Sequence, residues 1–434
     1  MMRRMPNEAP AGDLRLILSI QGLRAFVYGF GSVMIGAVLA ARGPGRLSDA
    51  AVGGVFTAML LGMAAASLGV AVWGDRLGRR RLYAGLLLTM GGAGAVFAFT
   101  RSLPALLIAS ITGTLSTDPN ESGPITSLEQ AMIGEAPPAT RVRVFGRYNA
   151  IAYLTGAVGA LAAGGPAAFR HLFPGLPANQ RFLLAFPVIA AIAAILVSRL
   201  TPTVEGHRLR SPRIEPRRSL PSQRVIRRLA GLFALDSFGG GFVVQSFLAF
   251  WFHRKFGASV ATLGLVFFGA GLLQAASSVA AARLAGRIGL LNVMVFTHLP
   301  SNALLVAVPF APNLTVAVVL LLCRFALSQM DVPTRQAYLA TVVEPEESTP
   351  AAAYTNTARY ASRPLGPVAG GALMQHVALA GPFVAGGALK IVYDAALYVL
   401  FRRLPLPAEA PPPSGTPSSS ATQTPSSQQP PSAP

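Results

Sequence analysis

The sequence predicts an all-α integral membrane protein whose spanning helices form two similar halves. Hydrophobic residues make up 52% of the 434 residues and charged residues only 12%, and the mean hydropathy is +0.51. Soluble domains carry about 25% charged residues, so this chain has too few charges to cover a surface that faces water. Long apolar runs recur along the chain, and a bilayer core of about 30 Å requires about 20 apolar residues per helix.

Twelve such runs predict twelve spanning helices. The first six lie near residues 16–41, 49–73, 82–100, 103–134, 148–169 and 181–200, and the second six lie near 229–252, 260–283, 290–310, 314–342, 354–378 and 382–401. The predicted domains are an N-terminal segment 1–15, a six-helix bundle 16–200, a linker 201–228, a second six-helix bundle 229–401 and a tail 402–434. The tail consists mainly of Pro, Ser, Thr and Gln, so we expect it to be disordered.

The arginine-rich connectors predict the orientation in the membrane. Arginines cluster in the connectors 74–81, 140–147 and 207–228, whereas the alternate connectors carry only scattered charges. Because positive loops stay in the cytoplasm, both termini should be cytoplasmic in a multi-pass protein of the plasma membrane. The formal net charge of +19 is therefore assigned to topology and not to nucleic-acid binding. For the basic linker, topology control alone is the plainer interpretation, and binding of anionic lipid headgroups is the alternative.

Spacings shared by the two halves predict a duplicated bundle. Gly78, after the second predicted span, has a counterpart in Gly286 after the eighth, an offset of 208. Pro124 in the fourth span and Pro333 in the tenth differ by 209. A constant offset near half the chain length is typical of transporters built from repeats.

The connector between the second and third spans reads Gly-Asp-Arg-Leu-Gly-Arg-Arg-Arg at 74–81. It resembles the loop signature of the major facilitator superfamily, Asp-Arg-x-Gly-Arg-Arg/Lys, with matches at Asp75, Arg76, Gly78, Arg79 and Arg80. Earlier positions of the signature hold Ala71 and Trp73 in place of the family's Gly and Leu. With twelve spans and a central linker, the resemblance extends to about residue 401 and implies a secondary transporter whose halves rock about a midplane site.

The physical chemistry of this loop is consistent with the resemblance. Asp75 is expected to accept from helix N-terminal amides or from an arginine. Gly78 is expected to permit a tight turn. The alternative is a set of topology arginines with a capping aspartate.

A second motif lies in the predicted eleventh span, where 366–371 read Gly-Pro-Val-Ala-Gly-Gly. Its residues Gly366, Pro367, Gly370 and Gly371 resemble the antiporter motif that the same superfamily carries in its fifth span. Here the fifth span has glycines at 159, 164 and 165 but lacks the proline. We expect the motif to bend the helix and let backbones approach closely, which supports export by antiport; packing of small residues for its own sake is the alternative.

Ionisable residues inside the spans are the candidate substrate and proton pathway. In the resembled fold, spans one, four, seven and ten line the cavity, and here these spans contain Arg24, Asp118, Glu121, Asp236, Arg324 and Asp331. Each costs about 2.5–3.5 kcal/mol at a helix centre, so each requires a partner or water. Glu121 is the first candidate for proton coupling and Asp118 the second, because neighbouring carboxylates favour retention of one proton. Structural pairing with Arg24 or Arg324 is the alternative.

Further charges lie at the ends of the last spans. We expect a gate in which three arginines, Arg335, Arg359 and Arg363, pair with Asp331 or Glu129 when the opposite side opens. Lys390 and Asp394 are four residues apart in the twelfth span and are expected to pair with each other.

Missing motifs narrow the function. The chain has no GxxxxGK[ST] phosphate loop, no Cys/His cluster with metal-ligand spacing and no nucleophile elbow, so we expect no ATP use, no cofactor, no metal and no enzyme. The resemblance implies a monomeric transporter in the lipid bilayer, with protons and a small amphipathic molecule as its partners. Proton-coupled efflux is the first interpretation. The alternatives are proton-coupled uptake of a small metabolite, for which Arg24 and Arg324 would suit an anion, and a membrane sensor or enzyme.

Overall fold

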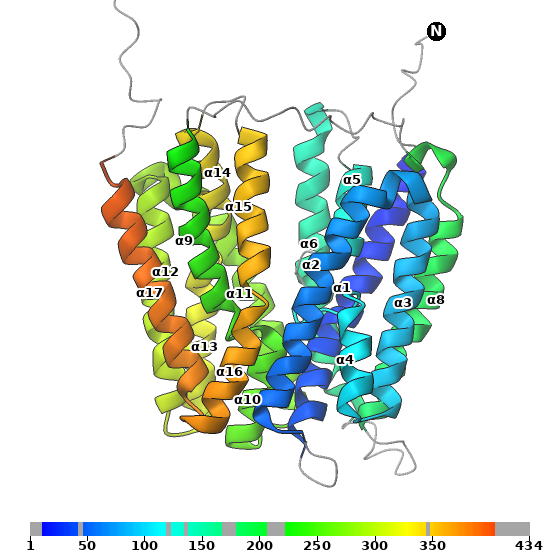
Figure 1. Cartoon of the computed structure of the whole chain (residues 1–434), viewed down its shortest axis with the longest axis horizontal. Helices are drawn as coiled ribbons and strands as arrows, with labels where there is room; N and C mark the ends of the chain where they lie inside the picture. The colour runs from blue at the N-terminus through cyan, green and yellow to red at the C-terminus, as the bar shows by residue number, and fades with distance from the viewer. Residues whose placement is uncertain are drawn as a thin grey trace, which may run out of the picture.

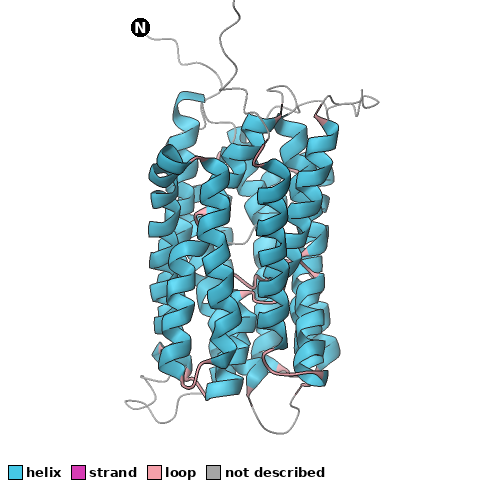
Figure 2. Ribbon diagram, turned by 90° about the vertical axis from the view of Figure 1, so that its left-hand side faces the viewer, coloured by secondary structure: helices cyan, strands magenta, loops and turns pink. Residues whose placement is uncertain are grey.

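The computed structural model describes residues 11–41, 47–118, 123–133, 138–166, 179–205, 222–343 and 348–403. All regular elements within these residues are helical, and they form two bundles that stand side by side (Figure 1 and Figure 2). The first half contains α1 (Ala11–Ala40), α2 (Asp49–Leu77), α3 (Arg79–Phe99), α4 (Leu103–Ile111), α5 (Pro124–Ile133), α6 (Pro138–Ala162), η1 (Asn179–Leu184), α8 (Ala185–Ser198) and η2 (Pro202–Glu205). The second half contains α9 (Gln223–Gly241), α10 (Gln245–Phe256), α11 (Val260–Ile288), α12 (Leu290–Ala307), η3 (Val308–Phe310), α13 (Leu314–Ser328), α14 (Asp331–Val342), α15 (Ser348–Ser362), α16 (Leu365–His376) and α17 (Gly381–Phe401).

These elements make twelve crossings of the bundle, which confirms the fold class predicted from the sequence. Among the described residues, nine helices are long and apolar enough to cross a membrane by length and composition. The other crossings are α4–α5 and α15–α16, which consist of short helices, and α6, which begins in a basic stretch. Large apolar side chains such as Ile108, Val279 and Phe310 are exposed on the outside, as expected where helices contact lipid.

Four crossings are broken between the two ends of the bundle: α4–α5, α9–α10, α13–α14 and α15–α16. Figure 2 shows such breaks as short loops. The sequence predicts a break only in the fourth span and a bend in the eleventh. Three glycines, 239–241, end α9, and Pro364 separates α15 from α16. Glycine costs a helix about 1 kcal/mol and proline about 3 kcal/mol relative to alanine, so these segments leave the helix where tertiary contacts satisfy their backbone.

Two glycines with positive φ connect long helices at equivalent places in the halves. Gly78 (φ 85°) joins α2 to α3, and Gly289 (φ 84°) joins α11 to α12. This left-handed region is open to glycine at little cost. The structural counterpart of Gly78 is therefore Gly289, and the pairing with Gly286 that the offset of 208 suggested is wrong by three residues; Gly286 lies inside α11.

The two halves contact each other away from the chain ends. We call the end at which α1 begins and α17 ends the terminus side, and the opposite end the far side. Figure 1 shows the halves diverging toward the terminus side and meeting on the far side, where α1 packs on α10, α2 on α16 and α6 on α11. Glycines permit this approach: a Cβ at Gly53 or Gly371 would come within 3.0 Å of a backbone oxygen of the other half, at Pro367 and Asp49 respectively.

The far-side contact gives a first prediction. Gly53→Val should push α2 away from α16 and destabilise the protein by about 1–3 kcal/mol, because overpacking forces the backbones apart. Thermal unfolding of the purified protein and the distance between spin labels on α2 and α16 measure this effect. The neighbouring Gly54→Val is the matched control, since a Cβ at Gly54 meets nothing within 4 Å. Equal behaviour of the two variants would contradict the prediction.

Candidate functional site

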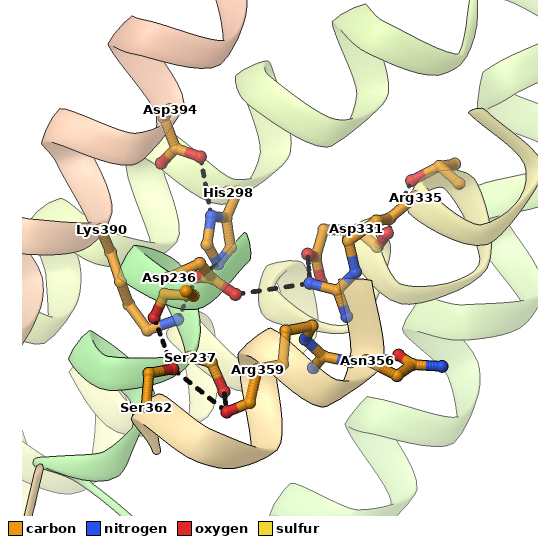
Figure 3. Close-up of polar contacts among 12 residues, drawn as sticks. Asp236, Ser237, His298, Asp331, Arg335, Asn356, Arg359, Ser362, Lys390 and Asp394 are labelled. Atoms are coloured by element: carbon orange, nitrogen blue, oxygen red, sulfur yellow. Dashed lines mark hydrogen bonds and ion pairs between the residues drawn. The ribbon is translucent and has the colours of Figure 1, made fainter. Parts of the chain in front are cut away.

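A buried cluster of charged side chains lies inside the second half (Figure 3). Its members are Asp236 of α9, His298 of α12, Asp331 and Arg335 of α14, and Lys390 and Asp394 of α17, and we call it the C-half cluster. None of these residues is more than 7% exposed. The cluster therefore ties four crossings of the second half together in an apolar interior.

Asp236 is the centre of the C-half cluster. Lys390 Nζ donates to its Oδ1 at 2.5 Å, and Arg335 Nη1 donates to its Oδ2 at 3.3 Å. His298 Nε2 lies 3.9 Å from Oδ1. Arg335 Nη1 also donates to Asp331 Oδ2 at 2.9 Å, so the guanidinium links two carboxylates.

Asp394 makes its own set of contacts within the C-half cluster. Its Oδ1 lies 2.8 Å from His298 Nδ1, and its Oδ2 accepts from Asn302 Nδ2 at 2.9 Å. The predicted pairing of Lys390 with Asp394 is therefore wrong. The two residues are four apart on α17. Even so, Lys390 bonds to Asp236 of α9, whereas Asp394 bonds to His298 of α12.

The first half contains a second buried cluster, in which Glu129 of α5 is fully buried. The carboxylate accepts from Arg24 Nη2 at 2.7 Å, from Tyr83 Oη at 2.6 Å and from Tyr148 Oη at 2.5 Å, and Arg24 also contacts Gln21. Arg24 is 2% exposed. This geometry pairs Glu129 inside its own half, so the predicted gate between Glu129 and an arginine of the second half is not formed here. The role of Arg24 in a substrate or proton pathway stays a prediction.

The two clusters occupy equivalent places with reversed polarity. In the first half, a cation on α1 pairs with an anion on α5; in the second, an anion on α9 pairs with a cation on α14. These elements belong to the first and fourth crossings of each half. Removing one partner of such a buried pair leaves an uncompensated charge, so each pair holds its half together.

Asp118 connects the halves at the point where three broken crossings meet. Its Oδ2 accepts from Arg363 Nη2 at 2.7 Å, in the break between α15 and α16. Its Oδ1 accepts at 2.9 Å from the backbone N–H of Gln245, the first residue of α10, where the helix dipole favours an anion. Thr117 O accepts from Ser246 N and Oγ, both at 3.0 Å. We call this arrangement the Asp118 junction.

The Asp118 junction supplies the carboxylate partner of Arg363 in this conformation. Of the predicted gate, the pair of Arg335 with Asp331 is present, while Glu129 is paired with Arg24. A gate that closes when the opposite side opens stays a prediction. Arg363 lies in the helix break next to α10, so Asp118 is its carboxylate partner. Glu121, the predicted coupling residue, lies outside the described residues.

Arg324 of α13 lies inside the protein, between the Asp118 junction and the C-half cluster. It is 8% exposed, its Nε has no hydrogen-bond partner, and its guanidinium carbon lies 5.2 Å from the ring centre of Phe325. The carboxylates that act on it electrostatically are Asp118 and Asp236. Arg324 is therefore turned inward, as the sequence predicts for a charge that cannot face lipid.

A pocket of about 90 Å³ opens between α9, α14 and α15. Its polar lining consists of Arg335, Gln336, Thr355, Asn356 and Arg359, and its apolar lining of Phe233, Leu339 and Ala352. Figure 3 shows Arg335 and Arg359 close to each other beside the C-half cluster. Sequence analysis assigned both arginines to a gate and did not predict the pocket.

The loop after α2 is organised by a residue that sequence analysis missed. Glu205 of η2 accepts from the backbone N–H of Arg79 at 2.6 Å and of Arg80 at 3.4 Å, at the start of α3. Arg80 Nη2 donates to Ser198 O at 3.1 Å. We expected Asp75 to accept from these amides, but its side chain lies outside the described residues, and Arg76 is exposed. The feature of the sequence that could have indicated this cap is Glu205 itself, a single glutamate near the start of the basic linker 201–228.

The glycine-proline motif lies in α16, where Gly366, Pro367, Gly370 and Gly371 are buried. A Cβ at Gly366 would collide with the backbone of Gly241, at the break between α9 and α10. The close backbone approach expected from the motif is therefore present.

Comparisons with known proteins agree with this architecture. A family model described as Major Facilitator Superfamily matches residues 229–430. A variant of the nucleoside transporter NupG superposes with a TM-score of 0.69 at 12% identity, over 89% of this chain and 100% of that chain. The chain has the major facilitator fold.

Two further comparisons cover nearly the whole major facilitator fold. A bacterial homolog of the human lysosomal transporter Spinster, in an inward-facing and occupied conformation, gives a TM-score of 0.68 at 16% identity, over 90% of this chain and 96% of that chain. An uncharacterized membrane protein of Saccharomyces cerevisiae, YJR124C, is 25% identical over 427 residues, covering 90% of this chain and 94% of the yeast protein.

The Arg24–Glu129 pair gives a second prediction. Glu129→Ala should destabilise the protein by about 3–5 kcal/mol, because it leaves the Arg24 guanidinium buried without a counter-charge. The double variant Arg24→Met/Glu129→Leu should recover most of this loss, since it removes both charges. Thermal unfolding of the purified variants measures both effects. A double variant no more stable than Glu129→Ala would contradict a structural pair.

Proposed function

We propose that this protein is a secondary active transporter that carries a small organic molecule across the membrane by alternating access. The Asp118 junction is the observation that supports this most directly. Three broken helices from both halves meet there around one ion pair and one helix N-terminus. In transporters, broken helices of this kind surround substrate and ion sites.

The distribution of polar contacts supports movement of the halves as rigid bodies. Each half has its own buried charge cluster, so its helices stay together. The polar contacts between the halves lie at the Asp118 junction and on the far side, where Arg254 Nε is 3.6 Å from Asp49 Oδ1 and Thr57 Oγ1 donates to Pro364 O at 2.7 Å. These contacts must break when the far side opens.

The proposed orientation has both termini in the cytoplasm of the plasma membrane, on the basis of the arginine-rich connectors. In this orientation the conformation in Figure 1 opens toward the cytoplasm. The protein is proposed to act as a monomer, because each chain carries both halves.

We assign proton coupling to the C-half cluster, with Glu121 as the second candidate. The His298 imidazole lies between two carboxylates, with Nδ1 2.8 Å from Asp394 and Nε2 3.9 Å from Asp236. Histidine is the side chain best suited to change charge near neutral pH. The other groups that face this arrangement are Lys390, Arg335, Asp331, Asn302, Tyr393 and, across from Arg335, Arg359.

Efflux by proton antiport is the proposed direction. It is supported by the resemblance of 366–371 to the antiporter motif, and by the position of this motif against α2 on the far side, where the two halves meet. Proton-coupled uptake of a small anionic metabolite is the second candidate, favoured by the arginines that line the pocket.

The Asp118 junction gives a third prediction. Asp118→Asn should shift the population toward a conformation open on the far side by roughly tenfold, because loss of about 1.4 kcal/mol changes an equilibrium constant by that factor. Distances between spin labels on far-side ends of α2 and α16 measure the shift in reconstituted protein. Arg402→Gln, which removes an exposed arginine, is the control. Unchanged distances in Asp118→Asn would contradict the role of the junction in alternating access.

A growth screen of a deletion strain on toxins and nutrients identifies a substrate: sensitivity to toxins indicates export, and failure on one nutrient indicates uptake.

The coupling assignment gives a fourth prediction. In proteoliposomes with an internal pH dye, His298→Gln should abolish substrate-driven proton flux while substrate still binds. Thr297→Val, whose hydroxyl bonds only within α12, is the buried control. Full proton flux in His298→Gln would remove this assignment, and loss in Glu121→Gln alone would transfer it to Glu121.

A further inference from the structure

The interior of the second half and its junction with the first contain more cations than carboxylates. Among the described residues, the cations are Arg324, Arg335, Arg359, Arg363 and Lys390, and the carboxylates are Asp118, Asp236, Asp331 and Asp394. Five positive charges therefore face four negative charges. Arg324, Arg335 and Lys390 are buried, and Arg359 and Arg363 are partly buried. A cation without a counter-charge in such surroundings is costly, so the excess of cations favours an additional anion.

Arg359 is a cation of this group that pairs with no carboxylate in the described part of the chain. Its Nε is buried and has no hydrogen-bond partner, and its Nη1 makes only a long contact of 3.5 Å with Asn356 Oδ1. The charged group that acts most strongly on Arg359 is another cation, Arg335. Two neighbouring guanidinium groups repel each other, and the repulsion grows as the surrounding dielectric falls.

The space beside these two guanidinium groups is a pocket. Arg335 and Arg359 line it together with the polar side chains of Gln336, Thr355 and Asn356. Its volume of about 90 Å³ accommodates a small charged group and not a whole drug-sized molecule. Phe233 and Leu339 supply an apolar wall.

We propose that Arg335 and Arg359 bind the carboxylate of an organic anion, and that the transported substrate carries this group. The proposal rests on the transport function proposed above and holds for either direction of transport. Guanidinium groups bind carboxylates with paired, charge-assisted hydrogen bonds, and an apolar wall next to them suits the carbon skeleton of the ligand. The anion would supply the carboxylate partner that Arg359 lacks among the described residues, whereas Arg335 is already paired with Asp331 and Asp236.

Anion-dependent thermal unfolding of the purified protein tests this site. The probes are sodium formate, acetate and benzoate, with benzamide as the uncharged counterpart of benzoate, and sodium chloride, which carries no carboxylate, keeps the ionic strength constant. At least one of the three anions should raise the unfolding temperature saturably, whereas benzamide should not. Arg359→Gln should weaken the apparent affinity at least tenfold, Arg359→Lys less so, and the exposed control Arg402→Gln not at all.

A second readout separates binding from a structural role. In sodium chloride alone, Arg359→Gln should unfold at the same temperature as the unaltered protein or higher, because the substitution removes a like-charge repulsion. A lower unfolding temperature there would show that Arg359 is structural and would overturn the proposal. The absence of any anion effect that Arg359→Gln loses would overturn it as well. The spin-label distances described above require no anion, so alternating access can be confirmed even if this inference fails.

Discussion

The cost of a charge inside an apolar bundle is the constraint on which the rest of this structure depends. The helices cannot expose Arg24, Glu129, Asp236 or Lys390 to lipid, so these residues must meet partners inside the protein. Satisfying them links specific helices by ion pairs: α1 to α5 in the first half, and α9 to α14 and α17 in the second. The ion pairs therefore act as specific connections in a bundle whose remaining contacts are mostly apolar.

The charged groups divide according to whether they act within a half or between the halves. Glu129 receives four hydrogen bonds from three residues and is buried inside its own half, so it has little freedom to exchange partners. Asp118 is partly exposed and combines an arginine with a helix N-terminus of the other half. A carboxylate of the first kind makes a half rigid, while one of the second kind can be released when the halves move.

Broken helices make the second kind of contact possible. A continuous helix satisfies its own backbone, whereas the starts of α10 and α16 place backbone groups within reach of the other half. The same interruptions let Gly241 and Gly366 bring two backbones together. The polarity at the junction of the halves and the close approach of their backbones therefore have one structural origin, in glycine and proline residues that interrupt apolar segments.

The sequence by itself determined the fold class, the spans and the inward placement of the described intramembrane charges, because hydropathy decides which segments leave water. It also determined that the motif at 366–371 would let backbones approach closely. Only the tertiary structure decided the partners. Lys390 meets Asp236 instead of Asp394, Arg363 meets Asp118, and Glu205 caps α3. These pairings depend on how each helix is rotated about its axis and where it breaks, and both are set by packing against neighbours far away in the chain.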